Sequence, residues 1–297
     1  MIGKDKHITD VLHLHFIVVI LGFTGVIGKL ISLPAIEMVW YRMLFAFIGL
    51  FIWLKFTGKL VVPDRKNLVK YLATGFIVAF HWVAFFGSIK SSTVSVALAC
   101  FASTALFTSL LEPLFNKSKI SFLEFFLGLI IIGAIVIIFK FESEYTLGII
   151  SGLASAVLGA LFMVLNKRFQ KEYKPVTITL FEMAGGFIAL SVFLPVYAAF
   201  TPVTLALNLS DLFWLLILSL LCTAYAFMAS IHVMRSLSAF QVVLTINMEP
   251  VYGIFLAFLI FGESELMTPG FYFGTVLLVL AVFTYSLLKR KPRTVNL

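Results

Sequence analysis

The chain has 297 residues, of which 61% are hydrophobic and only 12% are charged, and its mean hydropathy is +1.09. Soluble domains carry about 25% charged residues, so this composition excludes a soluble enzyme or a soluble binding module. The formal net charge of +8 at pH 7 raises the question of a nucleic-acid partner, which the positions of the charges must decide.

Apolar runs of about 20 residues recur along the chain, and each is long enough to cross about 30 Å of hydrocarbon as a helix. The joints between them are short, so no soluble domain fits outside the membrane. The sequence therefore predicts an all-α polytopic membrane protein. Its ten transmembrane helices are expected at residues 12–31, 35–55, 68–88, 94–115, 121–140, 146–166, 176–199, 211–233, 239–261 and 268–288.

The basic residues gather at alternate joints. If the N-terminus is cytoplasmic, 18 of the 22 Lys and Arg residues lie inside, and the outer joints carry six acidic residues, Glu37, Glu142, Glu144, Asp211, Glu263 and Glu265. The positive-inside rule then predicts a multi-pass protein of the cytoplasmic (inner or plasma) membrane with both termini cytoplasmic. Because topology accounts for the basic charge, no nucleic-acid partner is expected.

Weak internal similarity divides the chain into two halves. Three matches have nearly constant offsets: Lys90-Ser91 to Arg235-Ser236 at 145 residues, Gly128 to Gly274 at 146, and Tyr41-Arg42-Met43 to Phe181-Glu182-Met183 at 140. These offsets indicate a duplication with five helices per copy, at residues 12–141 and 146–288. Because five is odd, the second copy must be inverted relative to the first, and inverted repeats are typical of secondary transporters.

The most unusual stretch is residues 244–263, where Asn247, Glu249 and Pro250 interrupt an apolar run. A charge at the bilayer centre costs roughly 2.5 to 3.5 kcal/mol on insertion scales, so it indicates a functional site. Pro250 removes a backbone donor and predicts a helix kink. The offset of 145 pairs Glu249 with the neutral Thr104, so the polar kink is expected in the second copy alone.

Residues 12–288 resemble the drug/metabolite transporter superfamily, specifically the EamA-domain type with two EamA repeats. The resemblance rests on Met248-Glu249-Pro250-Val251, on Phe261-Gly262-Glu263 at the end of the ninth span, and on Gly274 in the tenth. The first repeat matches less well: Ala105 stands where the family often has proline, and Lys117-Ser118 replaces Gly-Glu. The fourth span is therefore expected to be straighter than the ninth.

The resemblance implies a basket of ten helices that moves small organic metabolites, often amino acids or related compounds, by alternating access. Export is the favoured direction, and the motif does not define the substrate. No cofactor and no metal site are expected, protons are a candidate coupling ion, and the protein is expected to be a monomer or a weak homodimer in the lipid bilayer.

Arg42 and Glu182 occupy corresponding places in the two halves. Both are candidates to face a central site, where Arg42 offers a forked donor to a substrate carboxylate and Glu182 an acceptor to an amine. This arrangement would suit a zwitterionic substrate. The alternative is a purely structural role, in which each charge is paired with another residue to offset the cost of its burial, for example Arg42 with Glu37.

Glu249 and Asn247 are also candidates for substrate binding or gating. They are two residues apart, about 200° on a helix, so a bend is needed for both to contact one ligand. Glu249 is a candidate to carry a coupling proton, and the alternative is a protonated structural side chain bonded across helices.

Aromatic residues complete the candidate site: Tyr41, Trp82, Tyr252 and, beside Trp82, His81. The histidine could sense protons or stack on substrate, although a lone histidine beside aromatic residues more often forms an interhelical hydrogen bond. Lys29 is interpreted as a snorkelling side chain and Asn166 as a helix-end residue.

Other functional classes have less support. The chain lacks the paired aspartates, the His-Glu-x-x-His pattern and the serine elbow of an intramembrane enzyme, and it has no nucleotide-binding loop. A channel or a receptor remains an alternative, but an inverted duplication argues against both. The sequence therefore predicts a secondary transporter that is not an enzyme.

Overall fold

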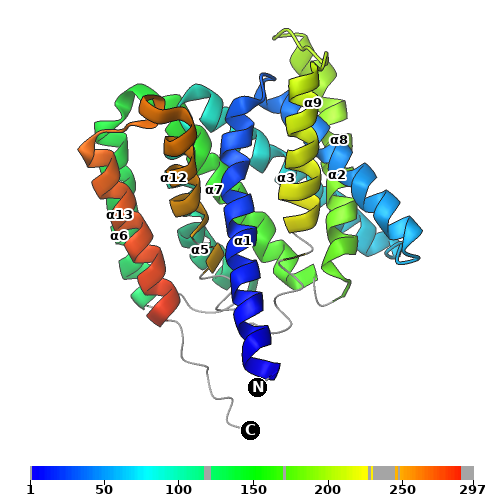
Figure 1. Ribbon diagram of the computed structural model, residues 1–297, viewed down its shortest axis with the longest axis horizontal. Helices are drawn as coiled ribbons and strands as arrows, with labels where there is room; N and C mark the ends of the chain where they lie inside the picture. The colour runs from blue at the N-terminus through cyan, green and yellow to red at the C-terminus, as the bar shows by residue number, and fades with distance from the viewer. Residues whose placement is uncertain are drawn as a thin grey trace.

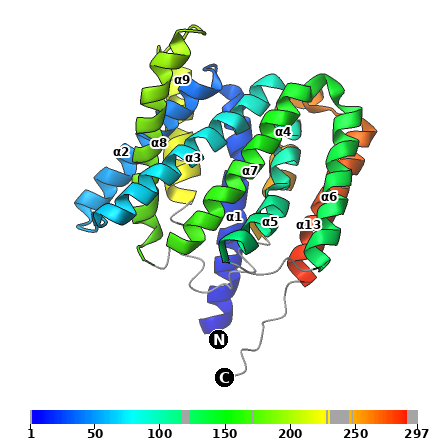
Figure 2. The same cartoon turned by 180° about the vertical axis from the view of Figure 1, so that it is seen from behind.

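A computed structural model of the protein describes residues 2–116, 122–169, 172–226, 229, 245–246 and 248–288. Helical rods packed side by side make up this part of the chain (Figures 1 and 2). The rods are α1 (Ile2–Leu30), α2 (Ala35–Phe56), α3 (Arg65–Ser91), α4 (Val94–Ala102) with α5 (Thr104–Asn116), α6 (Phe122–Phe141), α7 (Thr146–Phe169), α8 (Pro175–Ala198), α9 (Leu209–Leu216) with η2 (Ile217–Tyr225), α12 (Glu249–Phe261) and α13 (Pro269–Leu288).

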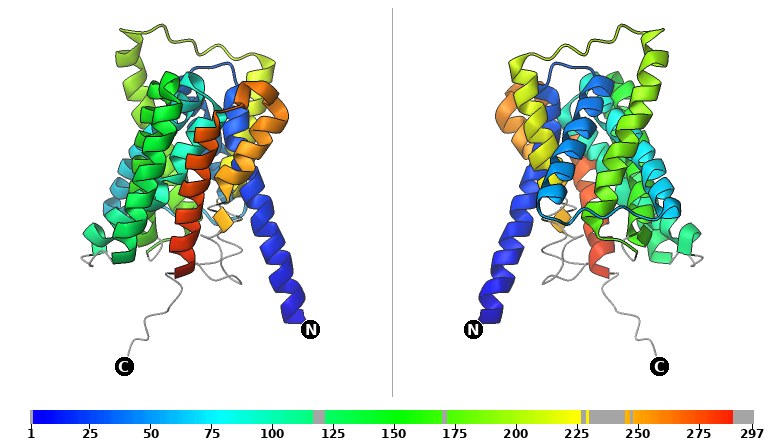
Figure 3. Two further views of the ribbon diagram at one scale, coloured as in Figure 1. Left: turned by 90° about the vertical axis from the view of Figure 1, so that its left-hand side faces the viewer. Right: turned by 90° about the vertical axis from the view of Figure 1, so that its right-hand side faces the viewer.

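We call the end of the bundle at which α1 begins the lower end, and the opposite end the upper end (Figure 1). Helix α13 also finishes at the lower end, and the first turns of α1 extend below the neighbouring rods (Figure 3). The two ends of the described helical bundle therefore lie on the same side, as an even number of crossings requires.

Five helical segments of the described chain are long and apolar enough to cross a membrane, and four shorter apolar helices, Val94–Thr108, Phe126–Phe141, Leu209–Tyr225 and Pro269–Ala281, lie at four more of the predicted spans. The long ones are Thr9–Leu30, Ala35–Phe56, Arg65–Ser91, Ser143–Asn166 and Pro175–Ala198. Many large apolar side chains point outward, including Val192 at 70% exposure and Phe255 at 60%. Such a surface is stable only in hydrocarbon, so the prediction of an all-α polytopic membrane protein is confirmed.

The predicted span 94–115 is broken. Helix α4 ends at Ala102, α5 begins at Thr104, and the hydroxyls of Ser103 and Thr104 donate to the carbonyl groups of Cys100 and Phe101. Such local bonds compete with a continuous helix. The fourth span, which was expected to be straighter than the ninth, is therefore interrupted at Ser103.

The break in the ninth span lies before Pro250, not at it. Helix α12 begins at Glu249 after a turn at Met248, and Pro250 occupies its first turn, where a missing N–H costs no hydrogen bond. Pro250 thus lies directly after an interruption of the ninth span, on the side where a proline breaks a helix. Helices α5 and α12 begin at Thr104 and Glu249, which are 145 residues apart, so the break is not confined to the second half of the chain.

Glycines hold α3 and α8 in backbone contact. A Cβ atom added to Gly75 would lie 2.1 Å from the carbonyl oxygen of Glu182, and one added to Gly186 would lie 2.0 Å from the Met43 sulfur of α2. At a similar crossing, a Cβ on Gly22 of α1 would lie 3.0 Å from the backbone nitrogen of Gly253. Small residues therefore set the spacing of the helices that carry the candidate site.

Buried carboxylates form hydrogen bonds between neighbouring helices at the upper end. Glu265, 1% exposed, accepts from Lys29 Nζ at 2.7 Å, from Ser95 Oγ at 2.7 Å and from the first amides of α4. Lys29 was predicted to snorkel, and the structure instead pairs it with an acid from the far half of the chain.

Two further acids act in the same way. Asp211, 2% exposed, accepts from Ser32 N at 2.7 Å and Ser32 Oγ at 2.5 Å, beyond the end of α1. Glu142 accepts from the amide and hydroxyl of Thr268, just before α13. These acids were predicted as charges of the outer joints, and in the structure they bind residues that are distant in the sequence.

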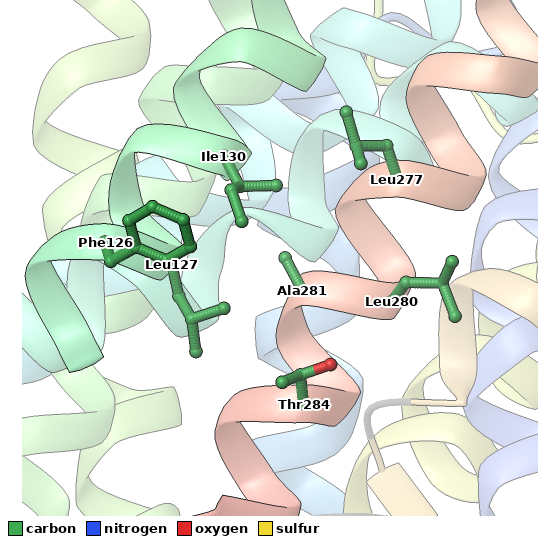
Figure 4. Close-up of a pocket in the computed structure, with 7 residues that line it drawn as sticks. All are labelled: Phe126, Leu127, Ile130, Leu277, Leu280, Ala281 and Thr284. Atoms are coloured by element: carbon green, nitrogen blue, oxygen red, sulfur yellow. The ribbon is translucent and has the colours of Figure 1, made fainter.

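An apolar groove of about 290 Å³ separates α6 from α13 at the edge of the bundle (Figure 4). It is lined by Phe126, Leu127, Ile130, Leu277, Leu280, Ala281 and Thr284. Because no charged side chain lines it, this groove is not a site for a polar metabolite.

Candidate functional site

Arg42 is the centre of the candidate site. Its side chain is 2% exposed, and its Nε donates to Thr223 Oγ1 at 3.0 Å. The guanidinium carbon lies 3.7 Å from the centre of the Trp82 ring and 5.5 Å from that of Phe86. These rings offer the negative face of a π system to the cation. Arg42 Nη1 is buried and has no hydrogen-bond partner.

Thr223 reaches Arg42 from η2, a π-helical segment. Its hydroxyl donates to the carbonyl group of Leu218, five residues earlier, at 2.9 Å, so its oxygen remains able to accept from Arg42. Short π-helical segments occur frequently at functional sites. The sequence analysis missed Thr223: a polar residue in an apolar run was the available signal, and hydrophobic periodicity does not reveal a π-helix.

Glu249 supplies the opposite charge. It is the first residue of α12, is partly buried, and interacts electrostatically with Arg42. Among the described residues, however, no acidic side chain forms an ion pair with Arg42 within 4.0 Å. The predicted alternative partner, Glu37, is fully buried, and neither of its carboxylate oxygens has a hydrogen-bond partner. Arg42 and Glu249 therefore attract each other without neutralising each other by contact.

Glu182 lies apart from Arg42. Its backbone packs on Gly75 of α3, and the side-chain amide of Asn166 on α7 acts on its carboxylate. Arg42 instead contacts Trp82, seven residues further along α3, which is about 10 Å along the helix axis. The sequence-based hypothesis paired Arg42 with Glu182 around one substrate, whereas the acid that interacts electrostatically with Arg42 is Glu249.

His81 forms an interhelical hydrogen bond. Its Nδ1 lies 2.8 Å from the carbonyl oxygen of Ser155 on α7, and because a carbonyl only accepts, Nδ1 carries the proton. The ring packs between Phe101 and Phe162, with ring centres 5.6 and 5.4 Å away. This is the structural alternative that the sequence analysis left open.

The hydroxyl groups of the two predicted tyrosines form hydrogen bonds away from Arg42. The Tyr41 hydroxyl donates to the Leu205 carbonyl group at 2.6 Å, near the upper end. The Tyr252 hydroxyl bonds His15 Nδ1 of α1 at 2.9 Å. Thus, of the predicted site residues, the structure brings together Arg42, Trp82 and Glu249, with His81 close enough to Arg42 to interact with it electrostatically, and the hydroxyls of Tyr41 and Tyr252 bond residues outside that group. Asn247 lies outside the described residues.

Comparison with known proteins identifies the family of this chain. The sequence profile of the EamA-like transporter family matches twice, over residues 11–140 and 146–287. An uncharacterized transporter of Bacillus subtilis (strain 168), YxxF, is 26% identical over 270 residues, covering 86% of this chain and 83% of its own. A second from the same organism, YyaM, is 25% identical over 302 residues, covering 95% and 96%.

A solved crystal structure shares the fold. It superposes with a TM-score of 0.64 over 96% of this chain and 99% of its own, at 14% sequence identity. The two family matches together span nearly the whole bundle, from the middle of α1 to the end of α13. The chain is therefore a member of the EamA-like transporter family, a multi-pass membrane transporter.

Proposed function

We propose that the protein is a secondary transporter that binds a small organic carboxylate, with amino acids as the leading class, beside Arg42, Trp82 and Glu249. The observation that carries this proposal is the buried guanidinium of Arg42, which has a free Nη1 and no ion pair among the described residues. A buried cation without a partner is costly, so the site gains most from an anionic ligand.

A carboxylate fits this position by its geometry. Nε is already bound to Thr223, and the unpartnered Nη1 remains available to one or both carboxylate oxygens. Glu249, close enough to act electrostatically on Arg42, offers a negative charge to the amino group of the same substrate. The proposed binding site for a zwitterionic substrate is therefore formed by Arg42 and Glu249, and no longer by Arg42 and Glu182.

An arrangement of two inverted five-helix repeats would place this site at the interface between the repeats. The two family matches have nearly equal lengths, and α5 and α12 begin at equivalent positions 145 residues apart. Interrupted helices at the repeat interface, with their N-termini directed at the substrate, are the arrangement that secondary transporters use at the membrane midplane.

Alternating access would proceed by opening the two ends of the bundle in turn. The Glu265–Lys29, Asp211–Ser32 and Glu142–Thr268 contacts support closure of the upper end. With the lower end in the cytoplasm, as the basic joints favour, this arrangement corresponds to an outward-closed state of an exporter in the cytoplasmic membrane.

Counterflow into liposomes tests the proposal. Purified protein should exchange a labelled amino acid from a panel of acidic, neutral and basic members, and Arg42→Gln should lower the flux at subsaturating substrate by about tenfold or more, because a charged hydrogen bond contributes about 1.5–3 kcal/mol. Arg65→Gln, which removes an exposed arginine at the start of α3, is the matched control and should retain the flux. Exchange of organic cations but of no carboxylate, or full flux in Arg42→Gln, would exclude this site.

A further inference from the structure

A second buried polar cluster lies where the lower halves of α3, α7 and α8 meet. It consists of Tyr71, Asn166 and Glu182, one from each helix. Tyr71 is 0% and Glu182 1% exposed. Each residue has a buried oxygen without a hydrogen-bond partner: the Tyr71 hydroxyl, Asn166 Oδ1 and Glu182 Oε1. Buried polar atoms are nearly always partnered, so three orphans in one place indicate an absent ligand.

The packing around the cluster is tight and apolar. Gly75 and Gly185 allow direct backbone contact between α3 and α8, because an added Cβ would lie 2.1 Å from the Glu182 carbonyl oxygen and 2.3 Å from the Leu72 carbonyl oxygen respectively. The Tyr71 ring packs on Phe169 at 5.1 Å and on Tyr173 at 6.1 Å. These contacts separate the carboxylate from the lower surface.

The hydrogen bonds leave a place for one proton. The side-chain amide of Asn166 acts on the Glu182 carboxylate, and Glu182 Oε1 and Asn166 Oδ1 are two buried acceptors, of which the single Tyr71 hydroxyl can donate to only one. Two acceptors cannot bond each other. A proton on the carboxyl group makes it a donor, and a carboxylic acid and an amide have complementary pairs of donor and acceptor. The same proton also removes the cost of burying a charge.

Among the described residues, no lysine or arginine forms an ion pair with Glu182. Tyr71 is the titratable group of α3 that faces the cluster, and Asp64, Glu172 and Tyr173, nearer the lower surface, act on it electrostatically. The nearby Lys70 is 3.8 Å from Glu172. From α2 the neighbour is the uncharged Met43, which touches Gly186 one turn beyond Glu182.

We propose that Glu182, with Asn166 as its hydrogen-bond partner, is a proton-binding site separate from the substrate site at Arg42, and that its proton is the coupling ion of transport. The carboxylate takes up one proton from one side of the membrane and releases it to the other when α8 moves relative to α7. The coupling role rests on the proposed function, whereas proton binding by Glu182 does not.

Infrared difference spectroscopy of the full-length protein in lipid membranes tests the site itself. Spectra recorded between acid and alkaline pH should contain a carboxylic-acid C=O band that is lost in Glu182→Gln and retained in the matched variant Glu249→Gln. Asn166→Leu should shift the band, because the carboxyl group loses its amide partner. If Glu182→Gln fails to fold, the shift of the C=O band in Asn166→Leu tests whether Glu182 binds the proton. An unchanged band in folded Glu182→Gln, or no shift in Asn166→Leu, overturns the proposal.

Transport measurements test the coupling. In liposomes, Glu182→Gln should retain exchange of labelled amino acid at equal pH but lose the accumulation that a pH gradient drives in the wild type. If a Na⁺ gradient replaces the pH gradient as the driving force, the proton assignment is wrong. If the wild-type protein shows the infrared band but no amino-acid flux, the proposed function is refuted and the proton site is retained. If it shows flux but no band, the proton site is refuted and the proposed function is retained.

Discussion

The guanidinium carbon of Arg42 lies 3.7 Å from the centre of the Trp82 ring, in a part of the bundle where both side chains are buried. A cation over an indole gains about 2 kcal/mol or more when it is desolvated. This contact keeps Arg42 charged and oriented without an ion pair, so the guanidinium stays available to a ligand.

Trp82 should therefore be required for substrate affinity. Trp82→Leu is expected to raise the KM of amino-acid counterflow by roughly 3- to 30-fold, since it removes about 0.5–2 kcal/mol of cation–π attraction. Trp82→Phe, which keeps an aromatic face, should lose less. Trp53→Leu, at an exposed tryptophan near the end of α2, is the control and should leave KM unchanged. Equal KM values in Trp82→Leu and wild type would contradict this prediction.

Glu265 should stabilise the closed upper end. Glu265→Gln loses the charge that Lys29 and the first turn of α4 bind, and we expect unfolding to become easier by about 1–3 kcal/mol, measured as a lower Tm in detergent. Glu263→Gln, two residues away and exposed, should stay within about 0.5 kcal/mol of wild type. Because Lys29 pairs with Glu265, Lys29→Met should add little further loss to Glu265→Gln, and full additivity of the two losses would argue against the pair.

Gly75 should not tolerate a side chain. Gly75→Ala places a Cβ about 2.1 Å from the Glu182 carbonyl oxygen, which is backbone and cannot rotate away. Overpacking typically costs about 1–3 kcal/mol, so α3 and α8 should separate or the protein should fail to accumulate. Gly87→Ala lies on the same helix with no atom within 4 Å of the new Cβ, and it should be neutral or slightly stabilising. Thermal unfolding of the two variants checks the difference, and similar Tm values would show that this crossing is loose.

The orientation of the bundle is open to a direct test. A cysteine at Lys66, near the lower end, should react with a membrane-impermeant thiol reagent only from the cytoplasm, and a cysteine at Glu144, near the upper end, only from outside. Both positions are exposed, whereas the native Cys100 and Cys222 are free and buried, so background labelling should be low. Labelling of Lys66→Cys from outside the cell would reverse the proposed topology.

Much of the fold follows from local sequence. Apolar runs of membrane length place most of the helices within a few residues, because a spanning helix must satisfy every backbone group internally. Charge asymmetry at the joints suffices to predict that both ends lie on one side. The motif around Met248-Glu249-Pro250 predicts the family, and the family profile confirms it.

Sequence reasoning failed where a residue's role depends on its neighbours in other helices. Asn166 was interpreted as a helix-end residue, but in the structure its side chain acts on the carboxylate of Glu182 in the next helix. Lys29 looked like a snorkelling lysine, and it pairs with Glu265 more than 200 residues away. Thr223 was missed because the π-helical turn that directs it to Arg42 leaves no periodic signal.

The sequence by itself determined that this chain is a membrane bundle of the EamA type and that Arg42, Glu182 and Glu249 are buried acids and bases that require explanation. Only the tertiary structure decided which of them belong together. Helix crossings at Gly75 with Gly186 and at Gly22 with Gly253 set the depth of each helix, and a shift of seven residues along α3 separates Glu182 from Arg42. Hydrogen bonds form only within about 3 Å and Coulomb attraction weakens with distance, so packing, not composition, places Glu249 near Arg42 and Asn166 near Glu182.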